Sequence, residues 1–218
     1  MKIALRAGHS PNCLGAEGLI SEYYSCYSIY SYLKILLEKQ GHEVVDCNSC
    51  ANSERTELSE GTNKANKSGA DIFISLHMNA FNNSSAHGSE IYLYPSPENL
   101  DDKHKSTIRL DAEYILDRFV DMGFANRGVK YNGSLHDLRA TVMPAMLVEI
   151  CFVTSPDDVS IYKRQGAENV ARGIASAFGK VDKVPVNAGG WKMLGDGLHY
   201  YDGNGNEIIH ILDKDVKL

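Results

Sequence analysis

The sequence predicts an α/β fold with three layers, in which a mostly parallel sheet lies between helices. Short apolar runs alternate with segments of helical apolar spacing along residues 1–180. Hydrophobic residues make up 43% of the chain and charged residues 23%, as in a globular protein with one sizeable core. The composition changes after Gly179, so we expect one main domain over residues 1–180 and a small β-hairpin tail over residues 181–218.

The first half of the main domain is expected to contain three strands and two helices. Residues 3–5 form an apolar run that ends at a Gly-His turn, which indicates a buried strand. From Ser21 the apolar residues recur at helical spacing, so Ser21 is the expected N-cap and Gly41 the C′ residue. The remaining elements are a strand over 42–45, a polar helix over 58–67 and a strand buried on both faces over 71–76.

The second half is expected to contain two strands and three helices. Residues 88–94 alternate as in a strand, and residues 107–122 carry a broad apolar helical face. Residues 145–150, after Pro144, indicate another core strand. A helix is expected to begin at Ser155-Pro156, and residues 166–178 predict the last helix.

The charge and the N-terminal residues exclude some classes of partner. The formal net charge is −6 and no basic stripe stands out, which argues against nucleic acid or an anionic membrane bound by bulk charge. No apolar run approaches a membrane span, and the N-terminal residues lack the apolar core of a signal peptide. We therefore expect no membrane insertion, and synthesis in the cytoplasm. Five scattered cysteines predict reduced thiols.

Four side chains indicate a catalytic metal site. His9 follows the first predicted strand, and His77 and Glu149 lie near the ends of two others. If these strands are parallel, the three side chains meet at the carboxyl edge of the sheet, where Glu22 at the start of the first helix also reaches. Two histidines and a glutamate are a common ligand set for catalytic zinc, and the apolar neighbours of Glu149 would raise its pKa towards that of a general base.

Two questions stay open at this level. A histidine at a strand end is often a structural, hydrogen-bonded residue, and the spacing alone does not separate this from a ligand role. Glu17 is a rival third ligand because it is nearer to His9, although it lies in a glycine-rich loop.

Five sequence blocks resemble the N-acetylmuramoyl-L-alanine amidase family. They are Arg-Ala-Gly-His9, Gly-Leu-Ile-Ser-Glu22, Ile-Ser-Leu-His77-Met-Asn-Ala, His87-Gly-Ser-Glu-Ile-Tyr and the segment around Met-Pro-Ala-Met-Leu-Val-Glu149. The resemblance covers residues 1–180 and implies a twisted mixed sheet of about six strands. It also implies one zinc ion held by His9, Glu22 and His77, with Glu149 as the catalytic acid/base.

The implied reaction is hydrolysis of the amide between N-acetylmuramic acid and L-alanine in peptidoglycan. Together with the N-terminal residues, this leads us to expect a phage or prophage endolysin. A zinc exopeptidase and a catalytically silent wall-binding protein are the alternatives. Arg139 could bind a carboxylate of the stem peptide or form a structural ion pair, and Asn79 could bind substrate or the turn backbone.

One departure from the family pattern concerns the first block. Many members have Asp-x-Gly-His where this chain has Arg6-Ala-Gly-His9. The ligand is retained, but any orientation that an acid at this position gives to His9 is put in doubt.

The tail resembles one copy of the aromatic wall-binding repeat of choline-binding proteins. Trp191, Tyr200 and Tyr201 carry this resemblance, after a linker rich in glycine. One hairpin buries too little surface to be stable alone. We therefore expect the tail to pack on the catalytic domain, or else to form a homodimer with a second copy.

Overall fold

The computed structural model describes residues 1–83, 85–100 and 105–181, together with the backbone of three strands nearer the C-terminus. The chain divides into two compact units, Met1–Lys180 and Val181–Leu218. They are described separately.

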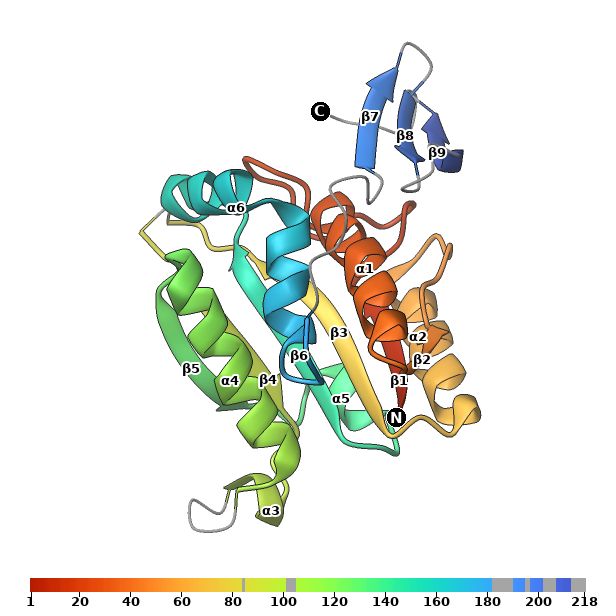
Figure 1. The fold of residues 1–218 in the computed structure, drawn as a ribbon, viewed down its shortest axis with the longest axis vertical. Coiled ribbons are helices and arrows are strands. Elements are labelled where there is room, and N and C mark those ends of the chain that lie inside the picture. The colour runs from red at the N-terminus through yellow and green to blue at the C-terminus, as the bar shows by residue number, and fades with distance from the viewer. Residues whose placement is uncertain (84, 101–104, 182–189, 195–196, 202–206, 213–218) are drawn as a thin grey trace. The chain divides into compact units, whose positions relative to one another are not determined.

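A six-stranded mixed sheet forms the centre of the first unit (Figure 1). Its strand order is β2-β1-β3-β6-β4-β5. Strands β2, β1, β3 and β6 run parallel, whereas β4 is antiparallel to β6 and parallel to β5. The bounds are β1 Lys2–Ala7, β2 Glu43–Asp46, β3 Ile72–Asn79, β4 Ser89–Leu93, β5 Asn126–Tyr131 and β6 Ala145–Phe152. The predicted fold class is therefore confirmed.

Helices cover both faces of this sheet. The first layer contains α1 (Glu22–Lys39), α4 (Thr107–Met122) and α6 (Pro156–Ala175). On the other face lie α2 (Glu54–Ser68) and the short α5 (His136–Arg139), and α3 (Pro97–Leu100) precedes α4. The second face thus has much less helical cover than the first.

Capping residues fix where the helices begin and end. Ser21 is the N-cap of α1, as predicted, and Gly41 beyond its end has a φ of 86°. Helix α2 begins at Glu54, four residues before the predicted start, because the Ser53 side chain accepts a hydrogen bond from Thr56 N. The expected separate helix over 166–178 is part of α6, which contains a non-helical break at Gly166 and ends at Ala175.

Alternation along the central strands decides which side chains face α2 and α5. Ala4, Phe73, Ala145 and Leu147 belong to one buried cluster that also contains Ala65 of α2 and Leu138 of α5. Because strand side chains alternate, Arg6, His77 and Glu149 lie on the same face as these residues. The candidate site therefore lies on the thinly covered face, at the carboxyl ends of the parallel strands.

The second unit contains a three-stranded antiparallel sheet. Its strands are β7 (Gly190–Leu194), β8 (Gly197–Tyr201) and β9 (Glu207–Leu212), in that order. The sequence pattern predicts only a hairpin, and β9 is a third strand beyond it. The side chains of Trp191, Tyr200 and Tyr201 and the predicted linker lie outside the described residues, so the expected packing or dimerisation of the tail stays a prediction.

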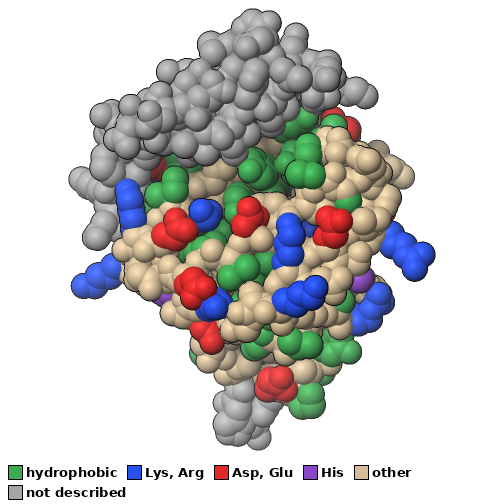
Figure 2. Space-filling model, turned by 90° about the vertical axis from the view of Figure 1, so that its right-hand side faces the viewer, with side chains coloured by type: hydrophobic (Ala, Val, Ile, Leu, Met, Phe, Trp, Pro, Cys, Tyr) green, Lys and Arg blue, Asp and Glu red, His purple; other side chains and the backbone are tan. Residues whose placement is uncertain are grey.

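The surface charges and the hydrophobicity of the helices are relevant to the predicted partners. On the face seen in Figure 2, lysine and arginine side chains are interspersed with aspartate and glutamate. Among the described residues, no helix is long and apolar enough to cross a membrane.

Candidate metal centre and catalytic site

His9, Glu22 and His77 come together at the carboxyl edge of the sheet. One potential ligand atom from each lies within 4.8 Å of the other two. The Glu22 carboxylate lies between the rings, with Oε2 3.1 Å from His9 Nε2 and Oε1 3.0 Å from His77 Nδ1. Glu17, the rival, is exposed and accepts a hydrogen bond from the Ser21 hydroxyl. The structure therefore groups Glu22, and not Glu17, with the two histidines.

This group of side chains fits a zinc ion. Zinc lies about 2.0–2.1 Å from histidine nitrogen and carboxylate oxygen, so two ligands at a tetrahedral angle are about 3.3 Å apart. The separations of 3.0 and 3.1 Å are close to this value. Gly15 keeps the space beside them open, since a Cβ there would lie 2.4 Å from His9 Nε2 and 2.5 Å from Glu22 Oε2. These residues can hold the metal on which the family generally depends.

The backbone at His9 is unusual. His9 has a φ of 70° and is the only non-glycine residue with positive φ in the part of the chain that the structure describes. This left-handed conformation costs free energy for a residue with a Cβ, although histidine adopts it more often than most. It turns the chain sharply after β1 and directs the ring towards Glu22.

The three side chains shift one another's pKa. Burial alone would raise the pKa of Glu22, but its hydrogen bonds with His77 and His9 outweigh burial and hold the pKa well below its ordinary range. Burial would lower the pKa of His77, but Asp137 and Glu22 outweigh it and raise the pKa to about 10. Binding of a metal must therefore displace a proton from His77, which makes affinity depend on pH.

Glu149 lies beside the three residues, in the next strand of the sheet. It is paired in register with His77 across β3 and β6. Its Oε2 is buried and has no hydrogen-bond partner among the described residues. Burial raises its pKa to about 7, with His77 opposing and Glu22 and Glu90 adding to the rise. The direction is the one that its apolar neighbours predict.

A cavity of about 450 Å³ connects these groups. His9, Glu22, His77, Asn79 and Glu149 all line it, together with residues of α2 and the α5 segment. This volume is within the range of about 300–1,000 Å³ that is usual for small-molecule and substrate sites.

The two tentative substrate-binding residues differ in position. Asn79 lines the cavity, where its Nδ2 donates to Glu90 at 2.9 Å and its Oδ1 accepts from Ala80 N at 2.9 Å. The backbone of the turn is thus one hydrogen-bond partner of Asn79. Arg139 is exposed at the end of α5 and donates to the Ser134 carbonyl at 3.4 Å, just outside the group that lines the cavity. A role in substrate binding stays a prediction for both.

A buried charged cluster lies behind the histidines, and its two acids, Glu57 and Asp137, are not among the predicted site residues. Arg6 is fully buried and forms ion pairs with Glu57 and Asp137, the latter at 3.3 Å. Ser75 Oγ donates to Asp137 Oδ2 at 2.7 Å. Arg6 could have indicated these two acids, because an arginine in a buried strand requires buried carboxylates as partners.

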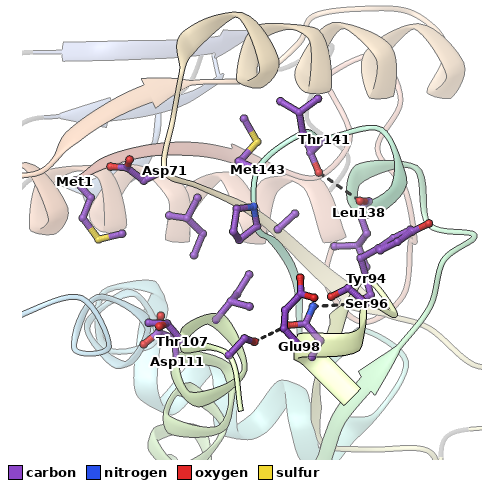
Figure 3. Close-up of a pocket in the computed structure, with 17 residues that line it drawn as sticks. Met1, Asp71, Tyr94, Ser96, Glu98, Thr107, Asp111, Leu138, Thr141 and Met143 are labelled. Atoms are coloured by element: carbon purple, nitrogen blue, oxygen red, sulfur yellow. Dashed lines mark hydrogen bonds between the residues drawn. The ribbon is translucent and has the colours of Figure 1, made fainter. Parts of the chain in front are cut away.

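A second hollow of about 450 Å³ lies at the opposite, amino edge of the parallel strands (Figure 3). Met1, Asp71 and Asp111 lie around it, with Tyr94 and Thr141 on other sides. Asp71 already accepts a hydrogen bond from Lys2 N. No histidine or cysteine is among the described residues that line this hollow, in contrast to the cavity at the carboxyl edge.

Comparison with known proteins agrees with the geometry. Residues 3–180 match the family described as N-acetylmuramoyl-L-alanine amidase. The chain is 34% identical over 181 residues to an uncharacterized protein of Clostridium perfringens, covering 82% of this chain and 51% of that protein. It is 30% identical over 180 residues to the sporulation-specific N-acetylmuramoyl-L-alanine amidase of Bacillus subtilis, covering 82% of this chain and 67% of the relative.

Solved structures show the same relationship. The catalytic domain of the CD27L endolysin targeting Clostridia difficile superposes with a TM-score of 0.72 at 28% identity, covering 84% of this chain and 99% of that domain. The chain spans about half the length of the first Clostridium perfringens relatives that it matches, 51% and 52%. The resemblance seen in the sequence is thus confirmed, and the chain belongs to the N-acetylmuramoyl-L-alanine amidase family.

Proposed function

We propose that this chain hydrolyses the amide bond between N-acetylmuramic acid and L-alanine in peptidoglycan. One zinc ion would be held by His9, Glu22 and His77, and Glu149 would be the catalytic acid/base. The observation that carries the proposal is the position of Glu149, a carboxyl group with a pKa near 7 directly beside the grouped histidines and Glu22. Membership of the family supports the substrate.

The metal ligands and Glu149 have separate chemical roles. A zinc ion in this site would lower the pKa of water and polarise the scissile carbonyl group. Burial raises the pKa of Glu149 above that of an ordinary carboxyl group, so it can accept the proton of the attacking water and later return it to the departing amine of L-alanine. Glu22 stays ionised throughout, since its pKa is far below that of Glu149.

The assignment is tested on purified clostridial cell walls. We expect wild-type protein to clear them and to release new amino-terminal L-alanine. Glu149→Gln should keep its zinc but lose activity by about 10²–10⁴-fold, the usual contribution of a general acid/base. Glu22→Gln should lose zinc, whereas Glu17→Gln, in the loop that precedes α1 and outside the group, should keep both zinc and activity.

Two outcomes would replace the proposal. Binding to walls without cleavage of any amide would favour a wall-binding protein. Release of amino acids from free peptides, with intact walls untouched, would favour an exopeptidase.

We further propose that the chain is an endolysin of a phage or prophage. The likeness to the CD27L catalytic domain and a 30% identity over 135 residues to the endolysin of Bacillus phage SPP1 support this. Expression in a Gram-positive host should cause lysis only when a membrane-permeabilising holin is co-expressed. Lysis without a holin would instead favour a secreted autolysin.

A further inference from the structure

We propose that Arg6 is a positioning residue for the metal centre: it holds Glu57 and Asp137 behind His9 and His77, so that each carboxylate orients one ligand ring. The inference rests on the proposed zinc site. It goes beyond that site because it assigns roles to three buried side chains on β1, α2 and α5.

Each histidine ring has an inner and an outer nitrogen. The inner nitrogens, His9 Nε2 and His77 Nδ1, face the Glu22 carboxylate. The outer nitrogens face the other two acids: His9 Nδ1 lies 4.0 Å from Glu57 Oε1, and His77 Nε2 lies 3.9 Å from Asp137 Oδ2. The two rings are therefore placed in the same way, each between Glu22 and a second carboxylate.

The outer atoms are buried and have room for one more bond. His9 Nδ1, His77 Nε2 and Glu57 Oε1 have no hydrogen-bond partner within the described part of the chain. A closure of about 1 Å would give N–H···O bonds of ordinary length. Histidines that bind metals usually donate their other N–H to a carboxylate or carbonyl group, which fixes the tautomer and the ring orientation.

Arg6 determines where the two carboxylates lie. Its Nη2 contacts Glu57, its Nη1 lies 3.3 Å from Asp137 Oδ1, and its Nε donates to the Ala7 carbonyl. A planar guanidinium can hold two carboxylates in a fixed relative position, which the single ammonium group of lysine cannot do. Ser75 holds the second oxygen of Asp137 from β3.

Gly61 of α2 provides the space that Arg6 occupies. A Cβ at this position would lie 2.8 Å from Arg6 Nη1 and 3.1 Å from the Cys47 carbonyl oxygen. Glycine weakens the interior of a helix, so its presence here is explained by the close approach of the guanidinium.

Stability alone does not account for this cluster. Three charges removed from water often stabilise a fold no more than well-packed apolar residues of the same volume would. An acid at the position of Arg6 would repel Glu57 and Asp137. Arg6 therefore acts on the metal centre indirectly, because it positions Glu57 and Asp137. Many family members carry an aspartate at the position of Arg6.

The test measures zinc affinity by competition with a chelator and the visible absorption spectrum of the cobalt-substituted protein. Glu57→Gln and Asp137→Asn each remove one outer carboxylate charge and should weaken zinc binding by about 10–100-fold. The cobalt spectrum should change as the ligand geometry relaxes. Arg6→Lys should show the same effects, because the ammonium cannot bridge both acids.

Removal of a single charge could unfold the protein, so a triple variant is included. Arg6→Met combined with Glu57→Gln and Asp137→Asn leaves no uncompensated buried charge, and it should remain folded while binding zinc weakly. Asp158→Asn is the matched control: Asp158 is equally buried and accepts from the backbone of Gly88 and Phe152, away from the histidines. It should leave zinc affinity and the cobalt spectrum unchanged.

The outcomes separate this proposal from the one on which it rests. If wild type binds zinc tightly and the triple variant binds it equally tightly, Arg6 has no positioning role and the zinc site stands. If Asp158→Asn weakens zinc as much as the other variants, the effect is one of general stability and the proposal is overturned. If wild type binds no zinc, both proposals fail.

Discussion

Replacing Glu149 by glutamine should stabilise the metal-free protein at alkaline pH while it removes activity. Burial raises the pKa of Glu149 to about 7 from an ordinary value of 4.5. The folded protein therefore binds this proton more readily than the unfolded chain does. The free energy of unfolding contributed by Glu149 falls as the pH rises from about 4.5 to about 7, and the carboxylate is a net cost above that range.

The size of the effect follows from the two pKa values. A difference of one in pKa corresponds to about 1.4 kcal/mol, so the whole gap corresponds to about 3 kcal/mol. Glu149 is only partly buried as a residue and lines the cavity, so solvent reduces this figure. We expect Glu149→Gln to gain about 1–3 kcal/mol relative to wild type between pH 5 and pH 8.

The assay is urea unfolding of both proteins at the two pH values, with a chelator present to keep them free of metal. Glu17→Gln is the control, because an exposed carboxyl group should show almost no such gain. Comparing differences between variants cancels the titration of the other groups. A stability difference between Glu149→Gln and wild type that is the same at pH 5 and pH 8 would refute the reasoning.

Three further predictions concern the supports of the metal centre. Gly61→Ala should lower the free energy of unfolding by about 1–3 kcal/mol in thermal or urea unfolding, because its Cβ would lie 2.8 Å from Arg6 Nη1; an unchanged stability would show that Arg6 moves freely. Gly15→Ala should weaken zinc binding in chelator competition, since its Cβ would lie 2.4 Å from His9 Nε2 and 2.5 Å from Glu22 Oε2; equal affinity would mean that the open space is not needed. Dialysis against a chelator should abolish wall clearing and added zinc should restore it, and activity that survives metal removal would contradict the zinc mechanism.

The sequence predicted best those strands and helices in which apolar residues follow a regular pattern. His9, His77 and Glu149 could be placed at one edge because their strands carry apolar runs typical of buried parallel strands, and β1, β3 and β6 are adjacent and parallel. Ser21 and Gly41 marked the ends of α1 because serine and glycine are typical residues at these positions, although the Ser21 side chain makes no capping hydrogen bond. These features depend on few distant contacts.

Other features depend on partners that are distant in the chain. Strand β5 (Asn126–Tyr131) lies at the edge of the sheet and has the polar sequence NRGVKY, so it lacks the alternation of a half-buried strand. Helix α5 has four residues, too few for any helical period. Glu57 lies in a helix of low apolar content, where an acid is usually solvated, but in the fold it is buried and paired with Arg6.

The shortness of α5 has a consequence for how this chain can diversify. Between β5 and β6 the chain crosses the catalytic face with one four-residue helix and a loop on each side of it, and Ser134, Leu135 and His136 from this crossing line the cavity. Connections of this kind accept insertions and substitutions more readily than strands do. A longer segment between β5 and β6 would cover one side of the cavity without displacing His77 on β3 or Glu149 on β6. New substrate preferences are therefore expected to arise by change in the exposed residues of 132–144, while Asp137 keeps its contacts with Arg6 and Ser75.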